Sequence, residues 1–63
     1  MTIYELISLL INESRQKVII YEVDTGRDLF EGYAVDIPER LLLSEVSSID
    51  NIKKGSTTIT INI

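Results

Sequence analysis

The side chains that could do chemistry in this 63-residue sequence are carboxylates, because ten Asp and Glu accompany six Lys and Arg, and neither Cys nor His occurs. Four carboxylates gather in one segment: Glu22, Asp24, Asp28 and Glu31. Paired carboxylates can act as general acid and base, but they need a cleft that holds a substrate, which so short a chain rarely builds. The stretch from Asp24 to Asp28 is also too short for an EF-hand calcium loop. We therefore interpret the four as an acidic surface and expect no catalytic residue, no metal site and no cofactor.

Composition excludes other chemistries and several partners. Without His and Cys, the nucleophile–base pairs of serine and cysteine hydrolases cannot form within this chain. The glycines stand alone, so no phosphate-binding glycine loop is present. A net charge of −4 argues against nucleic acid as a partner, and Lys53 with Lys54 is too small for a basic patch. No apolar run has the length of about 20 residues that spans a bilayer. We expect a protein that is not an enzyme, binds no membrane and stays in the cytoplasm, where Cys-free chains are common.

Hydrophobic periodicity predicts one α+β domain over residues 1–63, in the order helix, hairpin, short helix, hairpin, with a small antiparallel sheet. Apolar residues at helical spacing predict the first helix over residues 3–13. Thr2 and Glu5 have the spacing of a capping box at its start. A short helix is predicted over residues 38–43, because Pro38 suits a first helical turn.

The second half of the chain leaves two alternatives open. The short helix is capped either by Asp36 or by Ile37. Residues 45–52 form either an irregular strand, which we favour, or an extension of that helix. After a turn over residues 53–56, strict alternation predicts a strand over 57–63 with one buried and one solvated face. The predicted buried face carries Ile59, Ile61 and Ile63. The predicted solvated face carries Thr58, Thr60 and Asn62.

The first hairpin is predicted from strands over residues 17–23 and 28–35. A type I turn with Gly26 in the left-handed region avoids the positive φ that a two-residue turn would impose on Thr25. This turn pairs Val23 with Arg27, Tyr21 with Leu29 and Ile20 with Phe30. Gly32, inside a strand, indicates a bulge or a close approach by another backbone.

The predicted register divides the hairpin into two apolar faces. One carries Val18, Ile20, Phe30 and Ala34, together with Glu22, Asp28 and Gly32. The other carries Lys17, Arg27 and Glu31 among six apolar or aromatic residues: Ile19, Tyr21, Val23, Leu29, Tyr33 and Val35. One helix covers only one face of a sheet, and so small a chain usually needs a further stabilising element. We therefore predict a self-associating protein, with a dimer favoured, whose interface is formed by these six residues.

Five motifs follow one another along the chain: Glu5-Leu6-Ile7, Val18-Ile19-Ile20, Asp24-Thr25-Gly26 with Leu29-Phe30-Glu31-Gly32, Ile37-Pro38-Glu39 with Leu41-Leu42, and Thr57 to Ile63. Their order resembles that of small proteins carried by phages and prophages of Gram-positive bacteria. The resemblance implies a fold and a genomic setting, and it carries neither a catalytic residue nor an activity. It also suggests an alternative role, an acidic inhibitor or adaptor that presents a nucleic-acid-like surface to a host or phage protein.

Overall fold

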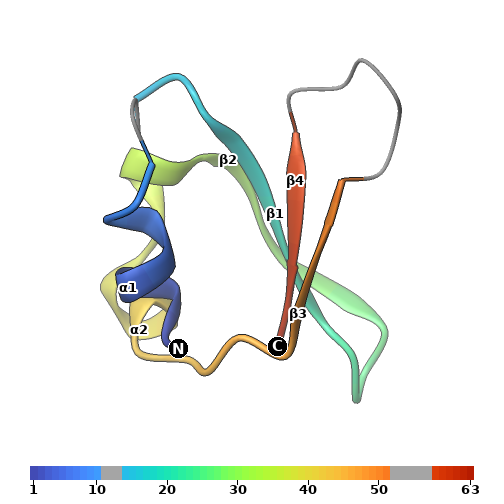
Figure 1. Ribbon diagram of the computed structural model, residues 1–63. Helices are drawn as coiled ribbons and strands as arrows, with labels where there is room; N and C mark the ends of the chain where they lie inside the picture. The colour runs from blue at the N-terminus through green and yellow to red at the C-terminus, as the bar shows by residue number, and fades with distance from the viewer. Residues whose placement is uncertain (11–13, 52–57) are drawn as a thin grey trace.

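The chain folds with its helices on one side of a twisted sheet, as the computed structural model shows for residues 1–10, 14–51 and 58–63 (Figure 1). In these residues the order is helix, two strands, a 3-10 turn, helix and two strands, which confirms the predicted α+β class. The elements are α1 Ile3–Ile7, β1 Lys17–Glu22, β2 Arg27–Tyr33, η1 Ala34–Asp36, α2 Glu39–Leu42, β3 Ser48–Asn51 and β4 Ile59–Asn62.

The sheet is mixed, so the prediction of an antiparallel sheet was wrong. Its strand order is β2-β1-β4-β3 over the described residues. The two hairpins are antiparallel, but β1 and β4 pair in parallel at the centre, with Val18 opposite Ile59 and Ile20 opposite Ile61. The connection through η1 and α2 lets the chain cross over the sheet before β3 and return along β4. Each hairpin therefore contributes one central and one edge strand.

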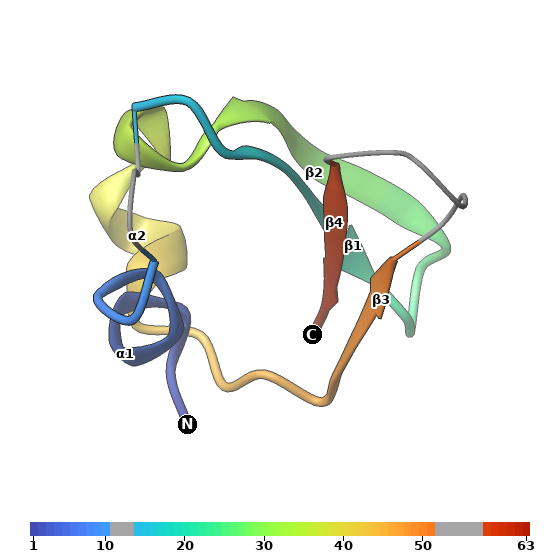
Figure 2. The same cartoon turned by 45° about the horizontal axis from the view of Figure 1, so that its top comes forward.

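The core lies between the helices and one face of the sheet (Figure 2). Val18, Ile20 and Ile61 from the central strands are fully buried, as is Ile3 of α1. The remaining buried apolar residues of the core cluster come from the helical side: Ile7, Ala34, Ile37 and Leu41. Burying one large apolar side chain of this kind stabilises the fold by roughly 1.5–3 kcal/mol, and partly buried apolar residues such as Leu6, Phe30 and Ile59 pack around the cluster.

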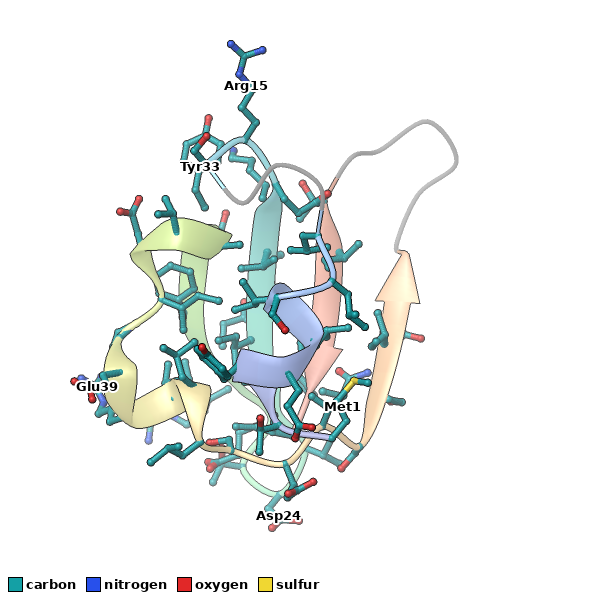
Figure 3. The ribbon with its side chains drawn as sticks, turned by 60° about the vertical axis from the view of Figure 1, so that its left-hand side comes forward. Met1, Arg15, Asp24, Tyr33 and Glu39 are labelled. Carbon is teal, nitrogen blue, oxygen red and sulfur yellow. The ribbon has the colours of Figure 1, made fainter. Side chains whose placement is uncertain are left out.

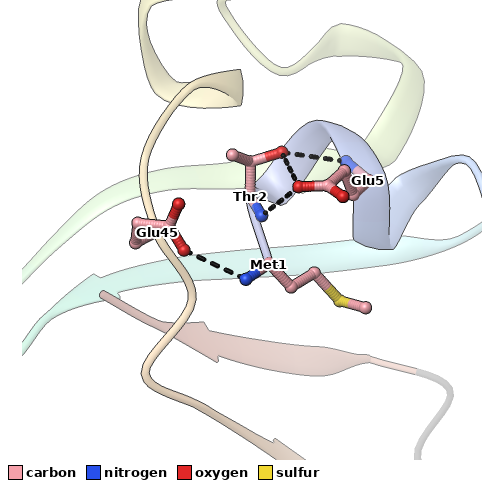
Figure 4. Close-up of polar contacts among 4 residues, drawn as sticks. All are labelled: Met1, Thr2, Glu5 and Glu45. Atoms are coloured by element: carbon pink, nitrogen blue, oxygen red, sulfur yellow. Dashed lines mark hydrogen bonds and ion pairs between the residues drawn. The ribbon is translucent and has the colours of Figure 1, made fainter.

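The start of α1 is fixed by the capping box that the sequence predicts (Figure 4). The Glu5 backbone N–H donates to Thr2 Oγ1 at 3.2 Å, and the Thr2 N–H donates to Glu5 Oε1 at 3.0 Å. The N-terminal ammonium of Met1 forms an ion pair with Glu45 Oε2 at 3.0 Å. Two backbone hydrogen bonds lie beside this ion pair. The Val46 N–H donates to the Met1 carbonyl at 2.8 Å, and the Ile3 N–H donates to the Ser44 carbonyl at 3.0 Å. The start of the chain is thereby tied to the segment between α2 and β3.

The first hairpin has the predicted glycine conformation but a different register near its turn. Gly26 has φ +68° and donates to the Glu22 carbonyl at 2.9 Å. Ile20 is opposite Phe30, as predicted, but a bulge then places Tyr21 opposite Asp28 and Glu22 opposite Arg27. The predicted pairs of Tyr21 with Leu29 and of Val23 with Arg27 were therefore wrong. The bulge moves Asp28 to the face that carries Tyr21, and it makes Leu29 the extra residue.

Gly32 marks neither a bulge nor an approach by another backbone. A Cβ at this position would lie 3.0 Å from Cζ of Phe30, so the Phe30 ring covers the space above the glycine. The bulge lies nearer the turn instead, between Ile20 and Tyr21 on the partner strand. The glycine thus allows Phe30 to fold along its own strand toward the core.

Several predicted boundaries also differ from the structure. Helix α1 ends at Ile7, and residues 11–13 of its predicted range lie outside the described residues. The cap of α2 is Pro38 and makes no side-chain hydrogen bond, so neither Asp36 nor Ile37 caps it. Strand β3 decides the open alternative in favour of a strand, although it begins only at Ser48. The predicted turn over residues 53–56 and the position of Gly55 lie outside the described residues.

Strand β4 has no solvated face, contrary to the prediction from its alternation. Thr60 and Asn62 are each only 8% exposed, because side chains of β1 and β3 on the same face flank them, Ile19 and Asp50 beside Thr60 and Tyr21 and Ser48 beside Asn62. Asn62 is satisfied by two hydrogen bonds, whereas Thr60 Oγ1 has no partner within the described part of the chain. An unsatisfied buried hydroxyl costs about 1–3 kcal/mol.

We predict that Thr60→Val raises the free energy of unfolding by about 1 kcal/mol, because a methyl group replaces the unpartnered hydroxyl and the β-branched shape is kept. Urea unfolding of the wild type and the variant measures the change. Thr60→Ser is the matched control, because it keeps the hydroxyl and should show no gain. A loss of stability in Thr60→Val would mean that the hydroxyl is hydrogen-bonded in solution.

The free energy of unfolding should fall at high pH, where the Met1–Glu45 ion pair is lost, and at low pH, where the Thr2–Glu5 hydrogen bonds are weakened. The Glu45 carboxylate, by its hydrogen bond and then its charge, raises the pKa of the Met1 amine, whose ordinary value is 8.0. This contribution is complete below pH 8.0 and is lost as the pH rises through the raised pKa. Hydrogen bonds from Thr2 lower the pKa of Glu5 from 4.5, so that contribution is complete above pH 4.5 and is lost on acidification.

Thermal unfolding across pH tests both limits. We expect Glu45→Gln to flatten the alkaline decline and leave the acid decline intact. Glu5→Gln should do the reverse. If both variants keep the wild-type profile, other groups govern the pH dependence.

Candidate interaction surface

The helices leave one face of the sheet uncovered, and we call it the open face. It is defined by the side chains that alternate with the core residues, namely Lys17, Ile19, Tyr21, Asp28, Glu31, Tyr33, Ser48, Asp50, Thr60 and Asn62. Both helices lie on the opposite side of the sheet in two views (Figures 1 and 2). Because opposed residues on neighbouring strands share a face, the register arranges these side chains in rows across the sheet.

Two complete rows cross the open face. The first runs from Glu31 through Ile19 and Thr60 to Asp50. The second, which runs through the bulge, consists of Asp28, Tyr21, Asn62 and Ser48. In each row an acidic residue of β2 lies at one edge, and uncharged side chains occupy the central strands. The open face therefore has an uncharged middle, an acidic edge on β2 and, on β3, one acidic and one neutral residue.

Three of the six predicted interface residues come together on the open face. Ile19 and Tyr21 are half-buried on β1, and Tyr33 of β2, opposite Lys17, is 43% exposed. Val23 lies just beyond β1, where its N–H donates to the Ile63 carbonyl at 3.0 Å, and its side chain is 56% exposed. Ile19, Tyr21 and Tyr33 form the apolar half of the open face.

The other two predicted interface residues are placed differently. Leu29 is the extra residue of the bulge and is 36% exposed, so the pairing does not place it in a row. Val35 was predicted on a strand, but β2 ends at Tyr33 and Val35 lies in η1. Its exposed side chain therefore does not belong to a row of the open face.

The polar half of the open face was missed by the sequence analysis. The Asn62 side-chain amide donates to Ser48 Oγ at 2.9 Å and to Asp50 Oδ2 at 2.8 Å. This network fixes the Asp50 carboxylate beside the central strand. The alternation that includes Thr60 and Asn62 was visible in the sequence. Their position beside Ile19 and Tyr21 depends on the parallel pairing of β1 with β4, and no pattern in the sequence indicated that pairing.

The predicted acidic surface is divided between two places. Asp28 and Glu31 are exposed on the open face, whereas Glu22 alternates onto the other side of β1 and accepts a hydrogen bond from Thr25 Oγ1 at 2.6 Å. Asp24 lies at the tip of the hairpin, at the opposite end of the sheet from Tyr33 (Figure 3). The carboxylate that joins Asp28 and Glu31 on the open face is Asp50, from the far edge strand.

The open face lacks the features of an active site in the part of the chain that the structure describes. No group of three potential metal-ligating side chains occurs there. Its carboxylates lie on the two edge strands, and the two central strands separate Asp50 from Asp28 and Glu31. The arrangement is that of a contact surface with an apolar half and acidic edges.

Comparisons with protein families, curated proteins and solved structures found no family model, no curated protein and no structure that matches this chain. Within the described residues, no helix is long and apolar enough to cross a membrane.

Proposed function

We propose that this chain is a non-enzymatic protein-interaction domain that associates with a second copy of itself through the open face. The uncovered apolar half, formed by Ile19, Tyr21 and Tyr33, is the observation that supports the proposal. Tyrosine is enriched in interfaces, because its ring buries a large area while its hydroxyl tolerates water. A cytoplasmic location and the phage or prophage setting implied by the motif resemblance belong to the same proposal.

The proposed mechanism is face-to-face packing of two sheets. The apolar halves exclude water from each other, and the Asn62–Ser48–Asp50 network presents a fixed polar pattern that limits how the copies can be aligned. Packing two sheets at a spacing of about 10 Å would cover, in each copy, the face of the sheet that its own helices leave open.

We predict that Tyr21→Glu combined with Tyr33→Glu weakens self-association by at least about 100-fold, because two interface tyrosines are lost and two carboxylates are brought beside Asp28 and Glu31. Sedimentation equilibrium at micromolar concentration measures the change. Leu9→Glu is the matched control, because Leu9 is exposed on the helical side. A wild-type chain that stays monomeric to about 100 µM, where Kd corresponds to roughly −5.5 kcal/mol, would contradict the proposal.

Self-association should strengthen with salt. The described open face carries Asp28, Glu31 and Asp50 against Lys17, so two copies bring an excess of like charge together. Screening lengths shorten from about 30 Å at 0.01 M to 3 Å at 1 M, which reduces this repulsion. We expect Kd to fall several-fold over that range, and Asp50→Asn to reduce the dependence. An association that weakens with salt would instead indicate attractive ion pairs.

The same charge distribution favours one second candidate, an acidic adaptor whose open face binds a basic protein. Asp28 and Glu31 on β2 and Asp50 on β3 would then contact the cationic rim of the partner. This candidate predicts the opposite salt dependence, because binding between opposite charges is weakened by screening. In a pull-down from host lysate, the partner should be lost at rising salt and in a Glu31→Lys variant.

A further inference from the structure

A groove on the helical side of the molecule provides a second surface, separate from the open face. It is lined by Tyr4 of α1 and by four residues in and around α2: Ile37, Glu39, Leu42 and Leu43. Its volume is about 520 Å³. No sheet residue contributes to this described lining, so an occupant of the groove would leave the open face free.

The groove exists because both helices are too short to cover the apolar residues around them. Helix α1 directs Ile3 and Ile7 into the core, and α2 directs Leu41 there. Tyr4 and Leu43 lie on the remaining sides and are 62% and 76% exposed, whereas Ile37 is only 7% exposed. Apolar walls of this kind, beside a buried residue, suit one large apolar side chain of an occupant.

The charge of the groove indicates which charged group its occupant should carry beside the apolar side chain. Among the described lining residues, the ionised side chain is the carboxylate of Glu39, which is exposed on α2 at the side of the molecule (Figure 3). Because Glu39 is exposed, it attracts a cation only modestly, as exposed ion pairs do. The net charge of −4 favours a cation further and disfavours an anion.

We propose that this groove binds a segment of a partner protein in which a large apolar side chain is flanked by Lys or Arg. The apolar side chain lies against Tyr4, Leu42 and Leu43, and the basic group pairs with Glu39. The proposal does not rest on self-association, because its residues lie on the helical side.

Short capped dipeptides test the two parts of this recognition separately. The probes are a capped Phe-Lys, a capped Phe-Glu with the opposite charge, and a capped Ala-Lys without the ring. NMR titration of the full chain follows the resonances of Tyr4, Ile37, Leu42 and Leu43. We expect Phe-Lys to shift them saturably and to bind about three- to fivefold more tightly than Phe-Glu, as an exposed ion pair allows. Ala-Lys should not saturate.

Variants distinguish the groove from a general affinity for cations. Glu39→Gln should abolish the preference for Phe-Lys over Phe-Glu, and Leu43→Ala should weaken both peptides. Glu31→Gln, on the open face, is the matched charge control and should leave both affinities unchanged. Because Glu39 and Leu43 are exposed, the variants should fold, which circular dichroism verifies.

Three results would overturn the proposal. One is a set of shifts spread over the open face instead of the groove. Another is a charge preference that survives in Glu39→Gln. The third is a shift of the groove resonances with protein concentration alone, which would make a second copy the occupant. Failure of self-association in the sedimentation experiment would leave these results unaffected.

Discussion

Parallel pairing of β1 with β4 is the contact on which the other features depend. It places Ile20 beside Ile61 at the centre of the core, where both are fully buried. The same ladder places Ile19 beside Thr60 and Tyr21 beside Asn62 on the opposite side of the sheet. Core and open face are thus two sides of one register, and a slip of one residue would exchange them.

Local patterns in the sequence were sufficient for the local structure. The Thr2–Glu5 capping box, the left-handed Gly26 and the strand character of residues 48–51 were predicted from spacing and residue type, and the structure confirms them. For the capping box and the glycine, the deciding interactions lie within a few residues of one another, and for residues 48–51 the residue types themselves disfavour a helix. The core faces of β1 and β4 were also predictable, because alternation depends only on the period of a strand.

Features that depend on contacts between distant segments were not predictable in this way. The parallel pairing joins residues 41 positions apart in sequence, so alternation alone predicted Thr60 and Asn62 to be solvated, whereas they are enclosed. The bulge that moves Asp28 beside Tyr21 also has no clear signal, because its position is set by how β2 follows the twist of β1. Of the candidate surface, the sequence indicated the hairpin half and missed the half that β3 and β4 contribute.

The separation in sequence between β1 and β4 also has a consequence for how the chain folds. The strands of each hairpin are close in sequence, whereas the central ladder must bring together residues 41 positions apart, such as Val18 and Ile59. Loop closure lowers the entropy before any contact compensates for it, and non-local pairing slows folding. The central ladder joins Ile20 to Ile61 across 41 positions of the sequence, so it is the pairing of the sheet whose formation costs the most chain entropy.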